Sequence, residues 1–480
     1  MRTPFLPIAT IALLAACGDR DPTAPTLASV DAPPQHGVAV FGVTLFGPAG
    51  PVILVEGIND VGQTVGSRTV EAPVAGFRGW LYANGGFGDL PLPFLVLVSR
   101  AWGINASGLA VGQGDELPLA WEGGSFTLLS SSFAGTTHTG SARAVSDRGV
   151  IVGIEVDGSE ARAVWWNGIG DPSPAILQSS PDGLTIPVAV NDAGLIVGNT
   201  ELGPGTRAEA WAGPGAAPQP LRSFDGSTCS TSEPRGTAVG VRAVNQLGAI
   251  VGVCRVGGLE HAAYWSDRDA IPIDLDPDGF RNSSASDINE LGQIVGSVDG
   301  QPVLWVREGP GFRRFDLGTP GSPDESAGAS AINNTGVAVG STTVGDLDRR
   351  AARWEVPVQV GIDVVPGNAG NRLKLDTRGT ISVAVLGSRW LQVSGIDPQT
   401  LTLGNDDGQE TPVARKKKGT PITTLTDVNR DGRQDLVAQF EKRTLKNNDD
   451  LVPGTQTLVL LGRFRDGRHL RGADVVQANP

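Results

Sequence analysis

The sequence has little of the side chains on which most enzyme chemistry and metal binding depend. Its 480 residues include only four histidines, three cysteines, two tyrosines and one methionine. It contains no Gly-x-Ser-x-Gly elbow, no His-Glu-x-x-His pair, no Cys-x-x-Cys pair and no Walker-type phosphate loop. The common linear signatures of catalysis are therefore excluded. A histidine-based site would require His138 and His261 to meet in the fold.

Positive charge is also scarce. The chain has 38 basic residues against 51 acidic ones, and its net charge is −13. Such a chain repels polyanions, so nucleic acid is excluded as a partner. Glycine and proline, by contrast, are abundant at 66 and 34 residues, yet together they stay below the fraction typical of disordered chains. We expect a folded chain with many tight turns.

No apolar run reaches the roughly 20 residues that a membrane span needs. The run over residues 5–16 follows a basic start and predicts a signal peptide. It ends in Leu-Ala-Ala-Cys17-Gly, which resembles the bacterial lipobox. The resemblance implies that residues 1–17 are a lipoprotein signal peptide, that Cys17 carries a diacylglycerol anchor, and that the exported chain is held on a bacterial membrane, facing the periplasm or the cell surface. The alternative is an ordinary secretory signal cut after an alanine. Residues 18–36, rich in Pro, Ala, Asp and Thr, predict a flexible tether.

One motif occurs seven times between residues 58 and 354. It reads Ile/Val-Asn-x-x-Gly-x-x-Val-Gly and is followed by a tryptophan 13 to 18 residues after its first glycine. Only the third copy replaces the asparagine, with Ser146. A tryptophan at a fixed strand position fills the same gap in every copy, so we interpret these as core residues. They are Trp80, Trp121, Trp165, Trp211, Trp265, Trp305 and Trp354. Trp102, Trp166 and Trp390 lie outside this pattern and are the better candidates for recognition.

The spacing of the motifs predicts the fold class. Successive marker glycines are 41 to 54 residues apart, close to the length of one four-stranded propeller blade. The Asn-x-x-Gly segment predicts a turn between two strands, and the second glycine permits close backbone approach. We therefore predict an all-β chain with a seven-bladed β-propeller over residues 37–358. Residues 38–46 are expected to pair beside the strand of Trp354 and close the ring; an open solenoid is the alternative.

These repeats resemble the HAF repeats of bacterial extracellular proteins. The best local match is Asp316-Leu317-Gly318-Thr319 ahead of Ala331-Ile332-Asn333, and the resemblance covers roughly residues 50–356. The His-Ala-Phe that names the family is present only loosely, as in residues 261–265. The resemblance implies an extracellular location and no established activity.

Two cysteines remain if Cys17 is lipidated. In an oxidising compartment Cys229 and Cys254 predict a disulfide, with two buried thiols as the alternative. The bond would pin the loop over residues 219–236 to its own blade. This loop lies in the longest interval between motifs and is the candidate binding loop.

The composition changes near residue 360. All six lysines lie beyond residue 373, and residues 361–480 hold 17 basic and 14 acidic residues. Short apolar segments between Gly, Pro and Asn turns predict a small C-terminal β-sandwich over residues 359–480. We interpret the lysine run at 416–418 as a solvated hairpin tip.

One segment of this domain carries a metal-binding pattern. Oxygen donors alternate at Asp427, Asn429, Asp431 and Asp435, and Arg433 offers its backbone carbonyl. The pattern resembles calcium loops of the EF-hand and dockerin type, although Ala438 stands where those loops have a bidentate glutamate. The span 361–440 also resembles a C-terminal module of secreted bacterial proteins. Both resemblances imply Ca²⁺ as the cofactor; an acidic surface turn is the alternative.

These features favour a non-enzymatic, lipid-anchored binding or scaffold protein that presents propeller loops to a glycan or protein ligand. Calcium would stabilise its C-terminal domain, and we expect a monomer. One alternative is a propeller glycan hydrolase or lyase that uses carboxylates of the central channel. The other is a purely structural surface repeat protein.

Overall fold

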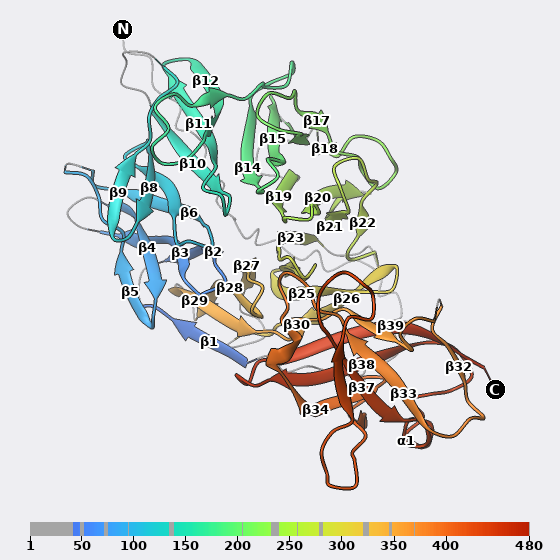
Figure 1. The fold of residues 1–480 in the computed structure, drawn as a ribbon. Helices are drawn as coiled ribbons and strands as arrows, with labels where there is room; N and C mark the ends of the chain where they lie inside the picture. Colours follow the sequence, from blue (N-terminus) through green and yellow to red (C-terminus); the bar gives the residue numbers. More distant parts are fainter. Residues whose placement is uncertain are drawn as a thin grey trace, which may run out of the picture.

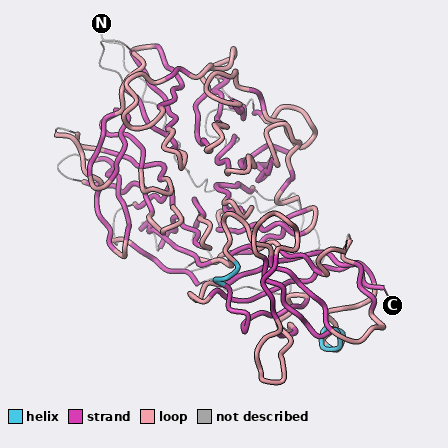
Figure 2. The backbone as a smooth tube through the Cα atoms, in the orientation of Figure 1, coloured by secondary structure: helices cyan, strands magenta, loops and turns pink. Residues whose placement is uncertain are grey.

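The computed structural model describes residues 42–479, apart from 49–51, 72–74, 95, 134–138, 204, 232–239, 257, 278–281, 320–325, 345–347 and 369. The described chain is almost entirely β-structure, and it forms a ring of seven small sheets with a two-sheet sandwich at one side (Figure 1). Strands dominate the backbone trace (Figure 2). Within the described residues, helix is limited to the turn η1 (Val393–Gly395) and to α1 (Lys442–Asn447).

Each sequence repeat forms one antiparallel sheet of the ring. The first three sheets contain β2 (Ile53–Ile58), β3 (Thr64–Val70), β4 (Gly76–Ala83) and β5 (Gly86–Asp89); β6 (Ser99–Ile104), β7 (Ala110–Gly114), β8 (Leu117–Glu122) and β9 (Ser125–Leu128); and β10 (Thr139–Val145), β11 (Ile151–Asp157), β12 (Glu160–Trp166) and β13 (Ala175–Ile176). The fourth contains β14 (Thr185–Val190), β15 (Ile196–Leu202), β16 (Gly205–Trp211), β17 (Gln219–Pro220) and β18 (Ser230–Thr231).

The remaining sheets continue in chain order. The fifth and sixth contain β19 (Gly240–Val244), β20 (Ile250–Val256), β21 (Leu259–Trp265) and β22 (Ile273–Asp274), and then β23 (Ser283–Ile288), β24 (Ile294–Val298), β25 (Gln301–Glu308) and β26 (Gly311–Asp316). The seventh contains β27 (Ala327–Ile332), β28 (Val337–Val344), β29 (Asp348–Glu355) and, from the start of the chain, β1 (Gly42–Phe46).

The seventh sheet joins the two ends of the repeat region. β1 is antiparallel to β29, with Val43 opposite Trp354. The predicted pairing is therefore confirmed for residues 42–46; residues 38–41 lie outside the described part of the chain. Contacts also join β2 of the first sheet to β27 and β28 of the seventh. The arrangement is propeller-like, and the all-β prediction is confirmed.

The motif asparagine forms the turn of its own hairpin and also binds the next sheet. Oδ1 of Asn245 accepts hydrogen bonds from the backbone N–H groups of Leu247 and Ala249 at 3.1 and 2.9 Å. Its Nδ2 donates to the carbonyl of Asn289 at 3.1 Å. The same outward bond recurs at Asn59, Asn105, Asn191, Asn289 and Asn333, whose Nδ2 bonds the carbonyl of Asn59. Hydrogen bonds therefore return from the last repeat to the first.

The second motif glycine allows a β-bulge in the innermost strand of every sheet. An added Cβ on Gly112 would lie 1.9 Å from the carbonyl oxygen of Arg100, and the other six sheets show the same conflict at 1.9 to 2.4 Å. Opposite each glycine, the innermost strand shifts register and leaves one residue unpaired. A bulge of this kind redirects the side chain of the extra residue. The glycine therefore determines where that side chain points.

The structure corrects the tryptophan assignment in the third repeat. Trp166 lies opposite Ile151, as Trp211 lies opposite Ile196 in the fourth sheet. Its side chain is fully buried and its Nε1 donates to the carbonyl of Ser130, whereas Trp165 is half-buried. Trp166 is therefore the core residue and is not a recognition residue. The other six predicted core tryptophans, Trp80, Trp121, Trp211, Trp265, Trp305 and Trp354, are all at most 2% exposed.

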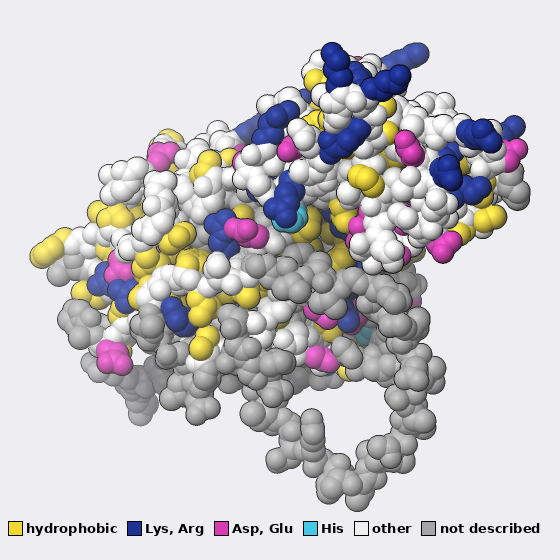
Figure 3. Space-filling view, turned by 90° about the horizontal axis from the view of Figure 1, so that it is seen from below, with side chains coloured by type: hydrophobic (Ala, Val, Ile, Leu, Met, Phe, Trp, Pro, Cys, Tyr) yellow, Lys and Arg dark blue, Asp and Glu magenta, His cyan; other side chains and the backbone are white. Residues whose placement is uncertain are grey.

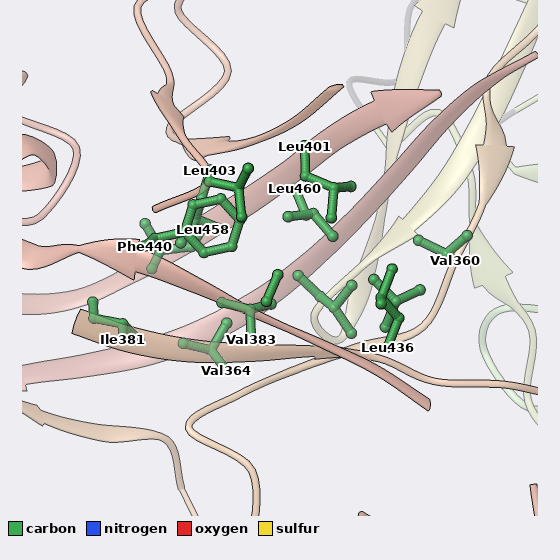
Figure 4. Close-up of a cluster of buried hydrophobic side chains, with 14 of the residues drawn as sticks. Val360, Val364, Ile381, Val383, Leu401, Leu403, Leu436, Phe440, Leu458 and Leu460 are labelled. Carbon is green, nitrogen blue, oxygen red and sulfur yellow. The ribbon is translucent and has the colours of Figure 1, made fainter. Parts of the chain in front are cut away.

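The C-terminal strands form two sheets around one apolar core. One sheet contains β30 (Val358–Gln359), β32 (Arg372–Lys374), β34 (Ile396–Gly404), β35 (Thr411–Pro412), β38 (Gly454–Phe464) and β39 (His469–Asn479); the other contains β31 (Ile362–Val364), β33 (Thr380–Val385), β36 (Thr423–Thr426) and β37 (Asp435–Glu441). Figure 4 shows side chains of both sheets meeting in this core, among them Leu403, Leu458 and Phe440. Leu291 of the ring packs against the same core.

The close approach at the bulge can be tested by comparing the stabilities of two glycine-to-alanine variants. Gly112→Ala should lower the free energy of unfolding by at least about 2 kcal/mol, because the new methyl group collides with backbone that cannot move alone. Gly88→Ala is the matched control, since nothing lies within 4 Å of its added Cβ in β5. Denaturant unfolding of both variants measures the difference. Equal stabilities would show that no bulge exists at this point of the sheet.

Candidate functional site

The seven bulge residues line a cavity of about 270 Å³ in the centre of the ring. Each lies three residues before the asparagine position of its motif, on the innermost strand of its sheet. They are Glu56, Trp102, Arg143, Val188, Arg242, Ser286 and Ser330. The frame around them, which consists of the seven sheets with their motif turns, repeats. These side chains, in contrast, differ in charge, size and polarity. The ring thus presents a chemically specific surface at its centre.

Most of the charge at this level is positive. Arg143 and Arg242 line the cavity, and Arg100 and Arg349 lie close enough to act electrostatically on Glu56. Loss of hydration in the ring interior raises the pKa of Glu56 to about 7, although these four arginines oppose the shift. Loss of hydration and the charge of Arg100 lower the pKa of Arg143 to about 10. Four arginines therefore act on Glu56, and Glu260 acts on one of them, Arg242.

A second level of the cavity is formed by the residues that follow the motif asparagine. Their side chains accept backbone N–H groups of the preceding repeat: Asp147 from Ala106 at 2.8 Å, and Asp60 from Asn334 at 2.8 Å. Glu290 accepts the N–H of Gln246 with both oxygens at 3.0 Å. The sequence predicts that the motif acids Asp60, Asp147, Asp192 and Asp287 serve turn formation; the structure shows that Asp60, Asp147 and Glu290 also connect neighbouring sheets.

Two of the acids near the cavity have strongly shifted pKa values. Burial raises the pKa of Asp287 to about 7, although its carboxylate accepts the N–H groups of Ile288 and Ile332. Burial and the neighbouring acids raise the pKa of Glu290 to about 7, against the hydrogen bond from Gln246. Both carboxylates are held by backbone hydrogen bonds, so their oxygens are already used by the frame.

The predicted binding loop lies away from the cavity. The structure joins Cys229 and Cys254 by a disulfide, with Cα atoms 5.6 Å apart. β17 and β18, within the predicted loop, both pair with β16 at the outer edge of the fourth sheet, whereas Cys254 lies on β20 of the fifth. The bond therefore connects two neighbouring sheets and does not pin the loop to its own sheet. Residues 232–236 of this loop are outside the described residues.

The calcium-type segment is an exposed turn with one buried end. Asp427 accepts the N–H groups of Asp431 and Gly432, and Asn429 accepts that of Asp431. The carboxylate of Asp435 is fully buried and accepts the N–H groups of Val428 and Gly387, both at 2.8 Å. Asp435 therefore closes the turn onto the sandwich. Among the described residues, no group of three or more His, Cys, Asp or Glu side chains is arranged to hold a metal ion.

A second cavity, of about 530 Å³, lies where the ring meets the sandwich. Glu290 and Leu247 of the ring line it together with Trp390 and Asn429 of the sandwich. The guanidinium of Arg389 lies 4.4 Å from the Trp390 ring centre. Of the two remaining recognition candidates, Trp390 is therefore at this junction and Trp102 is in the central cavity.

The lysine run forms an exposed turn of the sandwich. The N–H of Lys416 donates to the carbonyl of Thr420 at 2.8 Å, and residues 415–420 are exposed. Seen from below, Lys and Arg side chains gather near the upper right edge of the molecule (Figure 3). Residues 416–418 line neither of the two described cavities, so the run stays a solvated turn.

Sequence reasoning did not identify Glu56, Arg143 or Arg242 as site residues. The available signal was variability, because the seven copies differ in chemistry at the third residue before the motif asparagine, although they differ at other positions as well. That signal does not by itself say where the side chain points. Only the bulge directs all seven to one cavity.

No protein-family model matches the sequence, and a search of curated proteins returns no match. Among solved structures, the chain is similar to a puromycin-hydrolyzing peptidase of Mycobacterium tuberculosis, with 10% identity, a TM-score of 0.48, and coverage of 73% of this chain and 61% of that one. It is similar to TolB from Acinetobacter baumannii, with 10% identity, a TM-score of 0.32, and coverage of 61% and 64%. It is also similar to YCF48 bound to D1 peptide, with 10% identity, a TM-score of 0.39, and coverage of 68% of this chain and 99% of that one. This chain thus covers less than two thirds of the first two structures, and these similarities assign no activity.

The described part of the chain holds no helix with the length and apolar character to cross a membrane. Cys17, the predicted lipidation site, and His138 lie outside the described residues.

The raised pKa of Glu56 predicts how stability depends on pH. The folded chain holds this proton up to about pH 7, whereas an unfolded glutamate loses it near pH 4.5, so stability falls as the pH rises between these values. Glu56→Gln should remove this part of the dependence, on the order of 1 to 3 kcal/mol. Chemical unfolding at pH 5 and pH 8 measures it. An unchanged difference between the two pH values in the variant would contradict the assignment.

Proposed function

We propose that the protein is a non-enzymatic, lipid-anchored extracytoplasmic binding protein built on a closed seven-bladed β-propeller of the HAF-repeat type. The observation that carries this proposal is the set of seven unlike side chains that a repeating frame directs into one cavity. A rigid scaffold with a few specific polar groups in a central hollow is typical of ligand sites. The sandwich would act as a second rigid body beside the ring.

Among the described residues, the acids that line the cavity do not supply the pair of free carboxylates that a glycan hydrolase needs. Asp60, Asp147, Asp287 and Glu290 all accept backbone hydrogen bonds that hold the frame. Glu56 is the one acid lining the described cavity for which the structure gives no hydrogen-bond partner. The raised pKa values of Glu56, Asp287 and Glu290 favour the hydrolase or lyase as the second candidate, because shifted carboxylates cluster at catalytic sites. Measuring whether the protein releases product from a glycan would distinguish the hydrolase or lyase from the non-enzymatic binding protein.

The lipid anchor rests on the lipobox resemblance at Cys17. Residues 18–36 would then connect the membrane to the ring, and the first strand of the ring begins close behind them at Gly42. The mass of the protein extracted from membranes tests the anchor, because a diacylglycerol adds to the mass of the polypeptide that starts at Cys17.

We propose further that Ca²⁺ binds the exposed turn through Asp427, Asn429, Asp431 and the carbonyl of Arg433. We leave Asp435 out of the proposed ligands because its carboxylate is fully buried and closes the turn onto the sandwich through the N–H groups of Gly387 and Val428. Calorimetric titration with Ca²⁺ should show binding in the full chain and none in Asp427→Ala. Asp466→Ala, at an exposed turn of the sandwich, is the control and should bind as the native chain does. A silent titration of the native chain would reject the calcium site.

The binding proposal is tested by filling the cavity. Ser286→Trp combined with Ser330→Trp places two indoles in it from the bulges of β23 and β27, and should abolish binding to glycan and peptide arrays while the melting temperature stays within a few degrees. Ser125→Trp, on the exposed outermost strand of the second sheet, should leave binding unchanged. Array binding that survives in the filled variant would show that the cavity is not the binding site.

A further inference from the structure

The six lysines of the chain gather at one end of the sandwich, although they are far apart in the sequence. The short strand β32 runs beside the last residues of β39, with Lys374 opposite Asn479. Nζ of Lys442 donates to the carbonyl of Lys374 at 3.1 Å, and Nζ of Lys446 donates to the carbonyl of Leu375 at 3.2 Å. Both lysines of α1 therefore lie beside β32.

The lysine run joins the same end through a tight hairpin. The N–H of Ala414 donates to the carbonyl of Gln439 at 2.7 Å, three residues before α1 begins. The turn is closed by the N–H of Gly419, which donates to the carbonyl of Lys416 at 2.8 Å. Because the backbone of the turn is held by these bonds, residues 416–418 stay at the tip of the hairpin, at the end of the sheet that carries α1.

Positive charge dominates this end of the sandwich. We call residues 374–380, 414–420 and 441–449 the lysine end, and they hold nine basic and three acidic residues. The basic residues are Lys374, Arg378, Arg415, Lys416, Lys417, Lys418, Lys442, Arg443 and Lys446, and the acidic residues are Asp376, Glu441 and Asp449. All of the basic residues except Lys442 are exposed. Within the described part of the chain, no ion pair joins any of the nine to a carboxylate.

The lysine end lies away from the acidic ring. The ring contacts β39 at Arg471, which pairs with Glu308, whereas Lys374 lies beside the residue eight positions further along β39, a distance of about 26 Å. The 360 residues before the sandwich hold 21 basic and 37 acidic residues. The potential of exposed charges decays over about 10 Å at 0.1 M salt, so the ring does not cancel the charge of the lysine end. The chain repels polyanions as a whole, yet this end attracts an anionic surface.

We propose that the lysine end binds the anionic phospholipid headgroups of the membrane that carries the chain. This rests on the proposed lipid anchor and adds the surface of the protein that faces the membrane. β1 begins at Gly42, opposite Glu355, and the sandwich begins nearby at Val358, so the chain enters the ring beside the sandwich. Residues 18–41 can span about 80 Å when fully extended, so the anchor allows the lysine end to reach the bilayer.

The composition of the lysine end suits headgroups better than a single small ligand. A lysine ammonium is a point charge on a flexible stem, whereas an arginine guanidinium is a planar fork that fits one anion. None of the residues that line the two described cavities belongs to the lysine end. It therefore offers a surface of separate charges, which matches an array of lipid phosphates.

The experiment measures sedimentation of the mature chain with lipid vesicles, using Cys17→Ser so that no lipid is attached. We expect tighter binding, by at least about tenfold, to vesicles of equal parts phosphatidylglycerol and phosphatidylcholine than to vesicles of phosphatidylcholine alone, and release by salt. Lys416→Gln, Lys417→Gln and Lys418→Gln combined should weaken the binding by at least about tenfold, because each lysine near the surface contributes to it. The melting temperature should not change, since these side chains are exposed.

Two further variants separate the lysine end from charge in general. Arg148→Gln, Arg463→Gln and Arg465→Gln combined remove the same charge from exposed positions elsewhere and should change the binding by less than about twofold. Arg378→Gln with Arg443→Gln should weaken the binding severalfold, because these exposed side chains belong to the other two segments of the lysine end. Unchanged binding in this last variant would show that the three segments do not act together.

The proposal is overturned if the two kinds of vesicle bind equally, or if the triple lysine variant binds as the native chain does. Binding to heparin, an acidic polysaccharide, without binding to the vesicles would assign the lysine end to a glycan and equally reject the proposal. The mass of the membrane-extracted protein tests the anchor separately. A lipidated chain that ignores anionic vesicles would keep the proposed anchor and lose only this inference.

Discussion

The structure of the ring depends on a hydrogen bond between an asparagine side chain and the carbonyl of the next repeat. Asn289 and Asn333 show both uses of the residue: the side-chain oxygen orders its own turn and the amide group binds the neighbouring hairpin. Each such bond contributes roughly 1 kcal/mol, and more would be lost if the buried carbonyl were left unpaired. In the third repeat Ser146 has no side-chain amide to donate, and the link that remains is the one from Arg148 N–H to the carboxylate of Asp192, which has counterparts in the other repeats.

Because these bonds set the positions of the hairpins in six of the seven repeats, they also contribute to the direction of the bulge beside each hairpin. The same geometry is repeated seven times, and the frame therefore brings seven bulge residues to one axis. Apolar core and hydrogen-bonded turns provide the stability, which leaves the cavity residues free to differ.

The sandwich is attached to the ring by both apolar and ionic contacts. Arg471 of β39 pairs with Glu308 of β25 and with Asp406, which also binds Arg313 of β26 at 3.1 Å. Leu291 of the ring packs against the sandwich core. The contacts place Asn429, from the calcium-type turn, in the same junction cavity as Glu290. The calcium-type turn and the central cavity thus lie on either side of the motif turn that contains Glu290.

Local patterns in the sequence were sufficient to determine the number of sheets, the turns between their strands, the strand that completes the seventh sheet and the change to a second β-domain. These features follow from turn chemistry and spacing, which repeat along the chain. Other features depended on contacts between strands. A one-residue difference in register made Trp166 and not Trp165 the core residue. The packing of neighbouring sheets placed Cys229 beside Cys254, so the disulfide joins the fourth sheet to the fifth. Only the tertiary structure decided that Glu56, Arg143 and Arg242 face one cavity, because a bulge forms where a glycine meets the carbonyl of an adjacent strand, and that meeting cannot be seen in either segment alone.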